Sequence, residues 1–166
     1  MNPEPLIHMQ TWDRFAAVLA VAGQRLSALS STTAAARPMP DAWSKKQELG
    51  HLVDSAVNNY VRIIRVQRES APALPGYEQD AWVERQGYDD RDWMELVALW
   101  KALNQHMLAA ARRIPASSLA RTCTIAGGDS VTLGFLIEDY VDHMVHHLQH
   151  IGIALSEFRR PESAYA

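Results

Sequence analysis

Apolar residues recur at three- and four-residue spacing along four proline-free tracts of the chain. This spacing is typical of helices that bury one face. Proline clashes within a helix interior and removes a backbone donor, so the eight prolines mark where helices end. The four predicted helices run from Ile7 to Leu29, from Ser44 to Glu69, from Asp89 to just before Pro115, and from Val131 to Glu157. They predict an all-α fold, a four-helix bundle formed by one domain over residues 1–166.

Local signals at the helix ends and faces sharpen this prediction. Ser44 and Gln47 form a capping-box pattern at the start of the second helix. Acidic residues at 89, 90 and 92 favour the start of the third helix, where the helix dipole is positive. The residues expected to face the core are Leu49, Leu52, Val53, Ala56, Tyr60 and Ile63 in the second helix, Trp93, Leu96, Leu99, Trp100 and Leu103 in the third, and Leu133, Leu136, Ile137, Tyr140, Met144, Leu148, Ile151 and Leu155 in the fourth.

Two longer connections join the helices, which are expected to be antiparallel neighbours. Residues 70–90 are too rich in aromatic side chains for a flexible linker, so we expect an ordered crossover. In residues 116–130, the stretch from Arg121 to Ile125 is expected to be extended before Gly127 and Gly128, which predicts a small hairpin. The shorter stretch from Ser30 to Ala36 is interpreted as a linker without chemistry.

Composition and charge narrow the classes of partner. A chain of 166 residues, 48% hydrophobic and 21% charged, can bury a core unaided, so a bound metal would serve chemistry rather than folding. The net charge of −3 lacks the basic excess that binding to nucleic acid requires. The single cysteine, Cys123, is interpreted as structural and fits a reducing compartment. The first residues lack a signal-peptide pattern, and no apolar run is long enough to span a membrane, so we expect a cytoplasmic location.

Four of the seven histidines lie close together in the last predicted helix, at positions 143, 146, 147 and 150. Residues four apart stack on a helix, so His143 with His147, and His146 with His150, each present two imidazoles to one ion. At about 100° per residue, the first pair borders the apolar stripe and the second pair faces more toward water. Partial exclusion of solvent favours a metal site on His143 and His147.

A third ligand must come from another helix, and His51 is the only histidine in the second helix. Three neutral imidazoles leave one position open on a divalent ion, as in catalytic rather than structural zinc sites. This arrangement predicts Lewis-acid chemistry. The simpler alternative is that the histidines are solvated or hydrogen-bonded without a metal.

Other polar residues are candidates for supporting roles. Asp54 and Asp139 each lie about one turn from a predicted ligand, where a carboxylate accepts the second N–H of the imidazole. Arg62 and Arg65 are candidates to hold a substrate carboxylate by forked hydrogen bonds. His106 in the third helix is a weaker candidate because it has no ligand-type partner on its own helix. The chain has no H-E-x-x-H, G-x-S-x-G, Walker or G-x-G-x-x-G motif, so no organic cofactor is indicated.

Several segments resemble the DinB/YfiT-like superfamily. They are Trp43-Ser44, Leu49 to Ser55, Asn58 to Tyr60 and Arg62 in the second helix, Leu74 to Tyr77 and Trp82-Val83 in the crossover, and Asp139-Tyr140, His143, His146-His147 and His150-Ile151 in the last helix. The resemblance implies a DinB-like bundle, usually homodimeric, that binds a divalent metal, often zinc or nickel, through three histidines. Carried over to this chain, those ligands are His51, His143 and His147.

The resemblance also implies the activity classes. The first is a transferase that activates a low-molecular-weight thiol at the metal, with Arg62 or Arg65 positioning the thiol. The alternative is a hydrolase that uses water activated by the metal, with Asp54, Asp139 or His150 assisting proton transfer. Both would act on a small-molecule substrate. A third possibility is a non-catalytic metal-binding or stress-related dimeric module.

Overall fold

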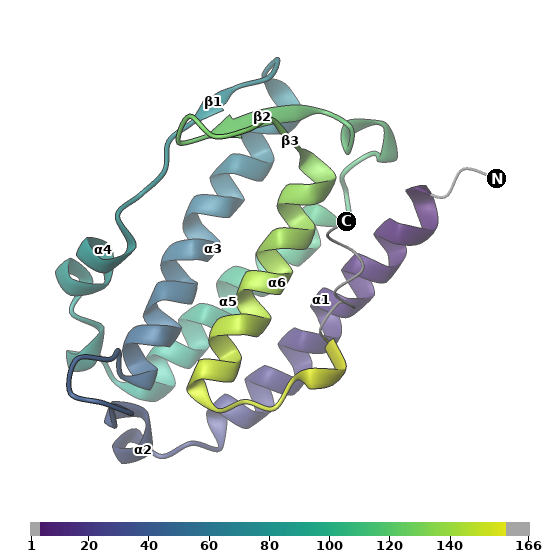
Figure 1. Cartoon of the computed structure of the whole chain (residues 1–166). Coiled ribbons are helices and arrows are strands. Elements are labelled where there is room, and N and C mark those ends of the chain that lie inside the picture. The colour runs from purple at the N-terminus through teal and green to yellow at the C-terminus, as the bar shows by residue number, and fades with distance from the viewer. Residues whose placement is uncertain (1–3, 159–166) are drawn as a thin grey trace.

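Four long helices form a bundle in the computed structural model, which describes residues 4–158 (Figure 1). They are α1 (Glu4–Ser27), α3 (Lys45–Arg68), α5 (Trp93–Ala111) and α6 (Leu133–Ile151). The shorter elements are the helices α2 (Ser31–Ala35) and α4 (Gln79–Gln86), the 3₁₀ turns Tyr88–Asp90, Ala116–Ser118 and Ser156–Phe158, and the strands β1 (Ala73–Leu74), β2 (Thr122–Ile125) and β3 (Val131–Thr132). The predicted all-α four-helix bundle is confirmed.

The helix directions follow from contacts at the two ends of the bundle. Helix α3 packs against α5 and α6, and α1 packs against the same two helices. Arg121, in the connection between α5 and β2, donates to the backbone carbonyls of Val66 and Glu69 at the end of α3 (2.8 and 2.7 Å), so α3 and α5 end on the same side of the bundle. Nε1 of Trp93, at the start of α5, donates to the carbonyl of Leu26 (3.0 Å), so α1 runs opposite to α5. The expectation of antiparallel neighbours is therefore wrong for α3 and α5, because the crossover returns along the bundle before α5 begins (Figure 1).

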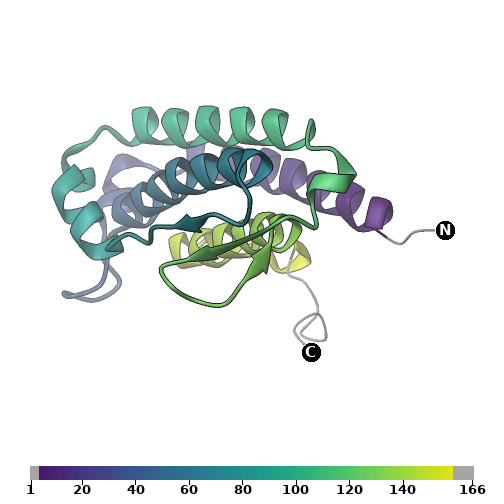
Figure 2. The same ribbon diagram turned by 90° about the horizontal axis from the view of Figure 1, so that it is seen from above.

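Three short strands lie at one end of the bundle, and Figure 2 shows them in front of α3 and α6. Strand β2 is antiparallel to β3, with Cys123 opposite Val131, and the turn between them passes through Gly127 at a φ of 74°. The predicted hairpin is thus confirmed. Strand β1 pairs parallel to β2, with Ala73 opposite Thr124. This pairing was not predicted, because a two-residue strand carries no periodic signal.

Side-chain caps start α3 and α5. Oγ of Ser44 accepts from the backbone N–H of Gln47, and Oε1 of Gln47 accepts from that of Ser44 (both 3.1 Å), so the predicted capping box is present. Helix α5 begins later than expected, because Asp92 accepts from the backbone N–H of Glu95 (3.0 Å) and caps it. The preceding acidic residues belong to the 3₁₀ turn Tyr88–Asp90.

Two boundaries differ from the expectation. The last helix was expected to reach Glu157, but α6 ends at Ile151 because Gly152 takes a left-handed φ of 96°. The stretch from Ser30 to Ala36 is not a plain linker, since it contains α2, whose first turn is capped by Ser30. Short polar side chains at the start of a helix supply this cap even where no apolar periodicity is visible.

The core fills the space between the four long helices. Its largest fully buried side chains are Phe15, Leu26, Leu49, Leu52, Ile63, Trp93, Leu96, Trp100, Met107, Leu133, Ile137 and Tyr140. Leu99 was expected to face this core but is 37% exposed, because α5 packs on α1 and α3 and leaves its third side open. Tyr60 and Leu103 pack against the core while only partly buried. No helix in the described part of the chain has the length and apolar character needed to cross a membrane.

Tyr88 packs against α3 and holds the crossover beside it. A Cβ atom added at Gly50 would lie 2.1 Å from Cδ2 of Tyr88, so the ring fits only because residue 50 is glycine. The Tyr88 hydroxyl donates to Oδ1 of Asp54 (2.6 Å), and Nε2 of Gln86 donates to the same oxygen (2.5 Å). This packing holds the crossover beside the stretch of α3 that carries His51.

Candidate metal centre

Three histidines from two neighbouring helices converge inside the bundle. His51 lies on α3, and His143 and His147 lie one turn apart on α6. Nε2 of His51 is 3.1 Å from Nε2 of His143, and one ligand nitrogen from each of the three rings lies within 4.8 Å of the others. The structure therefore brings together the three residues that the sequence singled out as metal ligands.

Burial keeps two of these imidazoles neutral. His51 is 1% exposed, and burial, aided by the neighbouring His147, lowers its pKa to about 4. Burial lowers the pKa of His143 to about 3, with further lowering from His147, His51 and His146. Both rings therefore offer an unprotonated nitrogen at neutral pH, which is the form that binds a metal.

Polar neighbours contact the outward-facing ring nitrogens of His147 and His143. Nδ1 of His147 lies 2.7 Å from Oε2 of Glu48, a carboxylate oxygen that can only accept. Nδ1 of His147 therefore donates to Glu48, and Nε2 is the ring nitrogen left to bind a metal. Nδ1 of His143 lies 3.4 Å from Oγ of Ser55. Carboxylate and hydroxyl partners of this kind orient the histidine ligands of metal sites.

Sequence reasoning missed Glu48. Glu48 lies three residues before His51, in the first turn of α3, where an acidic residue is expected from the helix dipole alone. Its position on the same face as His51 was an available signal, because residues three apart are neighbours on a helix. Asp54, proposed for such a role, accepts instead from Tyr88 and Gln86 of the crossover. Burial raises the pKa of Asp54.

A cavity of about 240 Å³ opens beside the histidines. Its lining residues are His51, Ser55, Asn59, Arg62, Tyr77, Gln79, Ile125, Leu136, Asp139, Tyr140 and His143. Of the supporting residues predicted from the sequence, Arg62 and Asp139 reach this cavity. The cavity also shows that Asn59 is the α3 amide on the histidine side, whereas Asn58 lines a separate, mostly apolar cavity.

Arg62 brings a cation into the cavity. Its Nη2 donates to the carbonyl of Pro75 (3.0 Å), and no ion pair with a carboxylate is found for it within the described residues. Burial lowers its pKa, which reflects the cost of placing an unpaired guanidinium there. Arg65 lies elsewhere, in a forked ion pair with Glu69 (2.6 and 2.8 Å). Of these two arginines, Arg62 is the one placed to meet an anionic group next to the histidines.

Aromatic rings enclose His51. The ring of Trp43 is 5.3 Å from that of His51, and the ring of Tyr77 is 6.5 Å from it, between centroids. Tyr77 packs in turn on Trp82 of α4 (5.1 Å). Burial raises the pKa of Tyr77, as does the charge of Asp54, so its hydroxyl stays protonated and able to donate. These rings shield His51 from solvent, and Tyr77 also lines the cavity with a polar group.

The remaining predicted residues lie outside this cavity. His150 is 49% exposed, with Nδ1 3.4 Å from Oε1 of Glu48. His106 lies 3.2 Å from the Tyr60 hydroxyl. Cys123 is buried in β2, and burial raises its pKa, which agrees with a structural cysteine.

The low histidine pKa values predict acid sensitivity of the metal-free protein. Unfolded histidines take up protons near pH 6.5, whereas folded His143 resists protonation down to a pKa of about 3. The free energy of unfolding should therefore fall as the pH drops below 6.5, by about 1.4 kcal/mol per pH unit for each such histidine. Urea titrations between pH 7 and 4.5 in chelator, compared with His143→Gln, measure this slope. The prediction is wrong if the variant loses stability with pH as steeply as the wild type.

Comparisons with known proteins agree with the fold. The family model of the DinB superfamily matches residues 10–151. A putative metal-dependent hydrolase of Oceanobacillus iheyensis is 29% identical over 109 residues, covering 66% of this chain and 63% of that protein. The putative metal-dependent hydrolase YfiT of Bacillus subtilis is 29% identical over 110 residues, covering 66% of this chain and 62% of that protein. The match thus spans less than two thirds of either relative.

Two solved structures share the architecture. The structure of Bacillus subtilis YfiT, a probable metal-dependent hydrolase with an unusual four-helix bundle topology, has a TM-score of 0.79 at 24% identity, covering 87% of this chain and 83% of YfiT. The mycothiol-dependent maleylpyruvate isomerase has a TM-score of 0.76 at 10% identity, covering 93% of this chain and 65% of the isomerase. At these identities the likeness is one of fold. With a family model matching most of its length, the chain belongs to the DinB superfamily.

Proposed function

We propose that this protein is an enzyme that acts on small molecules and depends on a divalent metal ion. Its metal ligands are His51, His143 and His147. The convergence of three ring nitrogens within 4.8 Å, beside a cavity, is the observation that carries the proposal. The relatives named as metal-dependent hydrolases support it. The homodimer, the cytoplasmic location and the lack of a nucleic-acid or membrane partner stay predictions.

The donor set fits a divalent ion such as zinc or nickel. Two nitrogens bound to one tetrahedral ion at about 2.0–2.1 Å lie about 3.3 Å apart. The Nε2 atoms of His51 and His143 are 3.1 Å apart, close to that separation. Imidazole suits both zinc and nickel, and three neutral imidazoles leave a position open for a reactant.

A divalent ion held there would supply Lewis-acid activation of a thiol or a water molecule in the cavity. The chain's own residues account for the rest. Glu48 orients His147, and Ser55 does the same for His143. Arg62 lines the cavity as a donor for an anionic reactant, and Asp139 lines it as a candidate proton acceptor. Trp43 and Tyr77 pack around His51 and limit access of bulk water.

We propose thiol S-transfer as the reaction. The unpaired guanidinium of Arg62 supports it, because the common low-molecular-weight thiols that carry carboxylates would be held by such a group. The structural likeness to a mycothiol-dependent isomerase agrees with this choice at the level of fold. Hydrolysis is the second candidate, and the names of the sequence relatives favour it.

The decisive experiment compares turnover with and without thiol. Zinc- or nickel-loaded protein is mixed with a panel of electrophiles, with and without glutathione or cysteine, and with esters and amides alone. Product that forms only with thiol supports S-transfer. Hydrolysis of esters or amides at the same rate without thiol contradicts it and favours the second candidate.

The substitution Arg62→Gln tests whether Arg62 binds the thiol or takes part in the chemical step. Removing the cation should raise the KM for an acidic thiol about tenfold or more with little change in kcat, because the lost contact binds ground state and transition state alike. Arg65→Gln is the matched control, since Arg65 pairs with Glu69 outside the cavity. Equal KM values in the two variants would overturn the role of Arg62.

A further inference from the structure

A second set of ligand atoms adjoins the three-histidine centre on its solvent side. It consists of Glu48, His147 and His150, whose ligand atoms also lie within 4.8 Å of one another. Oε2 of Glu48 is 2.7 Å from Nδ1 of His147, and Oε1 is 3.4 Å from Nδ1 of His150. We propose that this outer set binds a divalent cation in transit and passes it to the three-histidine centre. The inference rests on the proposed metal centre.

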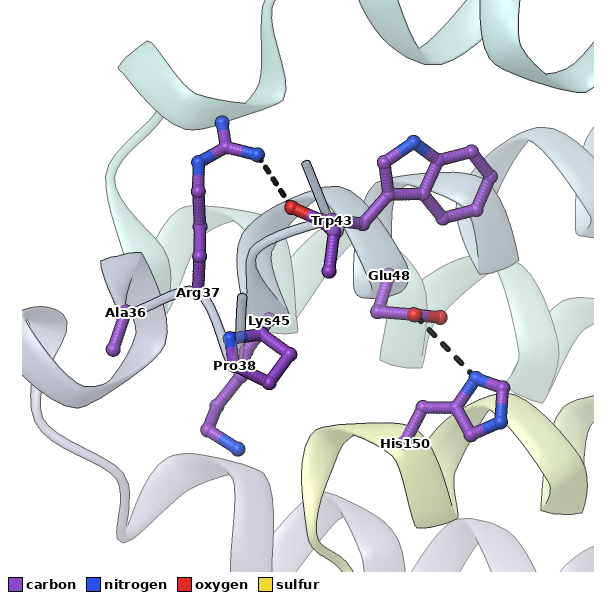
Figure 3. A pocket seen from close by; sticks show the side chains of 8 residues that line it. Ala36, Arg37, Pro38, Trp43, Lys45, Glu48 and His150 are labelled. Atoms are coloured by element: carbon purple, nitrogen blue, oxygen red, sulfur yellow. Dashed lines mark hydrogen bonds and ion pairs between the residues drawn. The ribbon is translucent and has the colours of Figure 1, made fainter. Parts of the chain in front are cut away.

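The outer set lies at the edge of a separate cavity. Glu48, His150 and Trp43 line a cavity of about 410 Å³. Figure 3 shows the side chains of Glu48 and His150 facing each other there. Exposure falls stepwise inward: the side chain of His150 is 49% exposed, those of Glu48 and His147 are 13% and 12% exposed, and His51 is 1% exposed. A hydrated cation arriving from solvent would meet His150 and Glu48 before the inner histidines.

The two cations that line this cavity are committed to other partners. Arg37 forms an ion pair with Asp89, and its Nη1 donates to the carbonyl of Ala42 (2.8 Å). Nζ of Lys45 donates to the carbonyl of Ile151 at the end of α6. Neither cation pairs with the carboxylate of Glu48, which contacts His147 and His150 instead. A carboxylate and two imidazoles form a donor set suited to zinc or nickel.

His147 belongs to both sets, and as a neutral imidazole it can serve only one at a time. A neutral imidazole has a single unprotonated nitrogen. With a cation on Nδ1 in the outer set, the proton resides on Nε2. With a cation on Nε2 in the inner set, the proton resides on Nδ1 and is donated to Glu48. Transfer thus releases one proton from Nε2 and takes one up on Nδ1, and the wild type holds one ion per chain rather than two.

An equilibrium titration tests the outer set directly. The double variant His51→Ala/His143→Ala leaves Glu48, His147 and His150 intact. We expect it to bind one Zn²⁺ per chain by calorimetry, more weakly than the wild type, and adding His150→Ala should lower that affinity at least tenfold. Adding His106→Ala instead is the matched control, since His106 lies on α5 beside Tyr60, outside both sets. Equal affinity in both triple variants would overturn the proposal.

Loading kinetics test the transit role. In the otherwise wild-type chain, His150→Ala should slow Zn²⁺ uptake measured by stopped flow about tenfold or more, while the final stoichiometry stays at one. His106→Ala should load at the wild-type rate. Unchanged uptake by His150→Ala contradicts transit through the outer set. A wild type that binds Zn²⁺ no more tightly than the His51→Ala/His143→Ala variant, with both losing affinity when His150→Ala is added, would instead overturn the inner centre alone.

Discussion

Replacing His143 by alanine should lower the affinity for a divalent ion about a thousandfold, or about 4 kcal/mol. The substitution removes one of three imidazoles, the one whose Nε2 lies 3.1 Å from that of His51. Because binding to the folded state alone stabilises it, the increase in melting temperature that Zn²⁺ causes in the wild type should become smaller in the variant. Competition against a chromogenic chelator measures the affinity, and thermal melts with and without Zn²⁺ measure the stabilisation.

His146→Ala is the matched control for this result. It removes a histidine from the same helix, but one that is exposed and outside both ligand sets. Its ion affinity and thermal shift should equal those of the wild type. Circular dichroism of the metal-free proteins establishes that each variant is folded. A His143→Ala variant that is folded and binds Zn²⁺ as tightly as the control would contradict the assignment of His143.

Replacing Gly50 by alanine should destabilise the fold by about 4 kcal/mol. An added Cβ would lie 2.1 to 2.5 Å from three ring atoms of Tyr88, so the ring must move. Overpacking costs about 1–3 kcal/mol, and losing the Tyr88 hydrogen bond to buried Asp54 costs about 1–3 kcal/mol more. Urea denaturation of the metal-free variant measures the loss.

Two controls isolate the contact between Gly50 and Tyr88. Gly23→Ala, in α1, introduces a Cβ whose nearest neighbour is the flexible side chain of Lys101 at 3.8 Å. It should stabilise the protein by about 0.5–1 kcal/mol, because glycine weakens helix interiors. In a Tyr88→Ala background the cost of Gly50→Ala should largely disappear, since the clashing ring is gone. A cost that persists in that background would show that the ring is not its cause.

The three central histidines were accessible from sequence because the helix period carries the necessary information. A spacing of four places His143 and His147 on one face of α6, and that face borders the apolar stripe. The contact of these two histidines with His51 cannot be predicted from the helix period. It depends on α3 packing against α6 in one register, and periodicity within each helix does not determine that register. The choice of His51 rested on its being the only histidine of its helix and on the family resemblance.

The residues around the centre were less predictable because several placements are equally compatible with a helix pattern. Glu48 and Asp54 flank His51 by three positions on either side, and both are acidic. Only the tertiary structure shows that Glu48 meets His147 while Asp54 meets Tyr88. The contact to Tyr88 arises from the crossover, whose path along the bundle leaves no periodic signal in the sequence.

Some details of the fold were likewise predictable from the sequence, and others were not. The capping box at Ser44 was predictable because its partners are three residues apart. The end of α6 was not, because Gly152 interrupts an apolar pattern that continues through Ile153 and Leu155, both of which are buried. The parallel orientation of α3 and α5 depends on the route of the crossover rather than on the pattern within either helix.

X-ray absorption of the Zn²⁺-loaded protein, purified without an affinity tag, tests the central claim most directly. The account predicts one zinc per chain with three imidazole ligands at about 2.0–2.1 Å. Loss of one imidazole from the spectrum of His51→Ala would assign that ligand to α3. A sulfur ligand, fewer than three imidazoles in the wild type, or no zinc retained after loading would contradict the three-histidine centre.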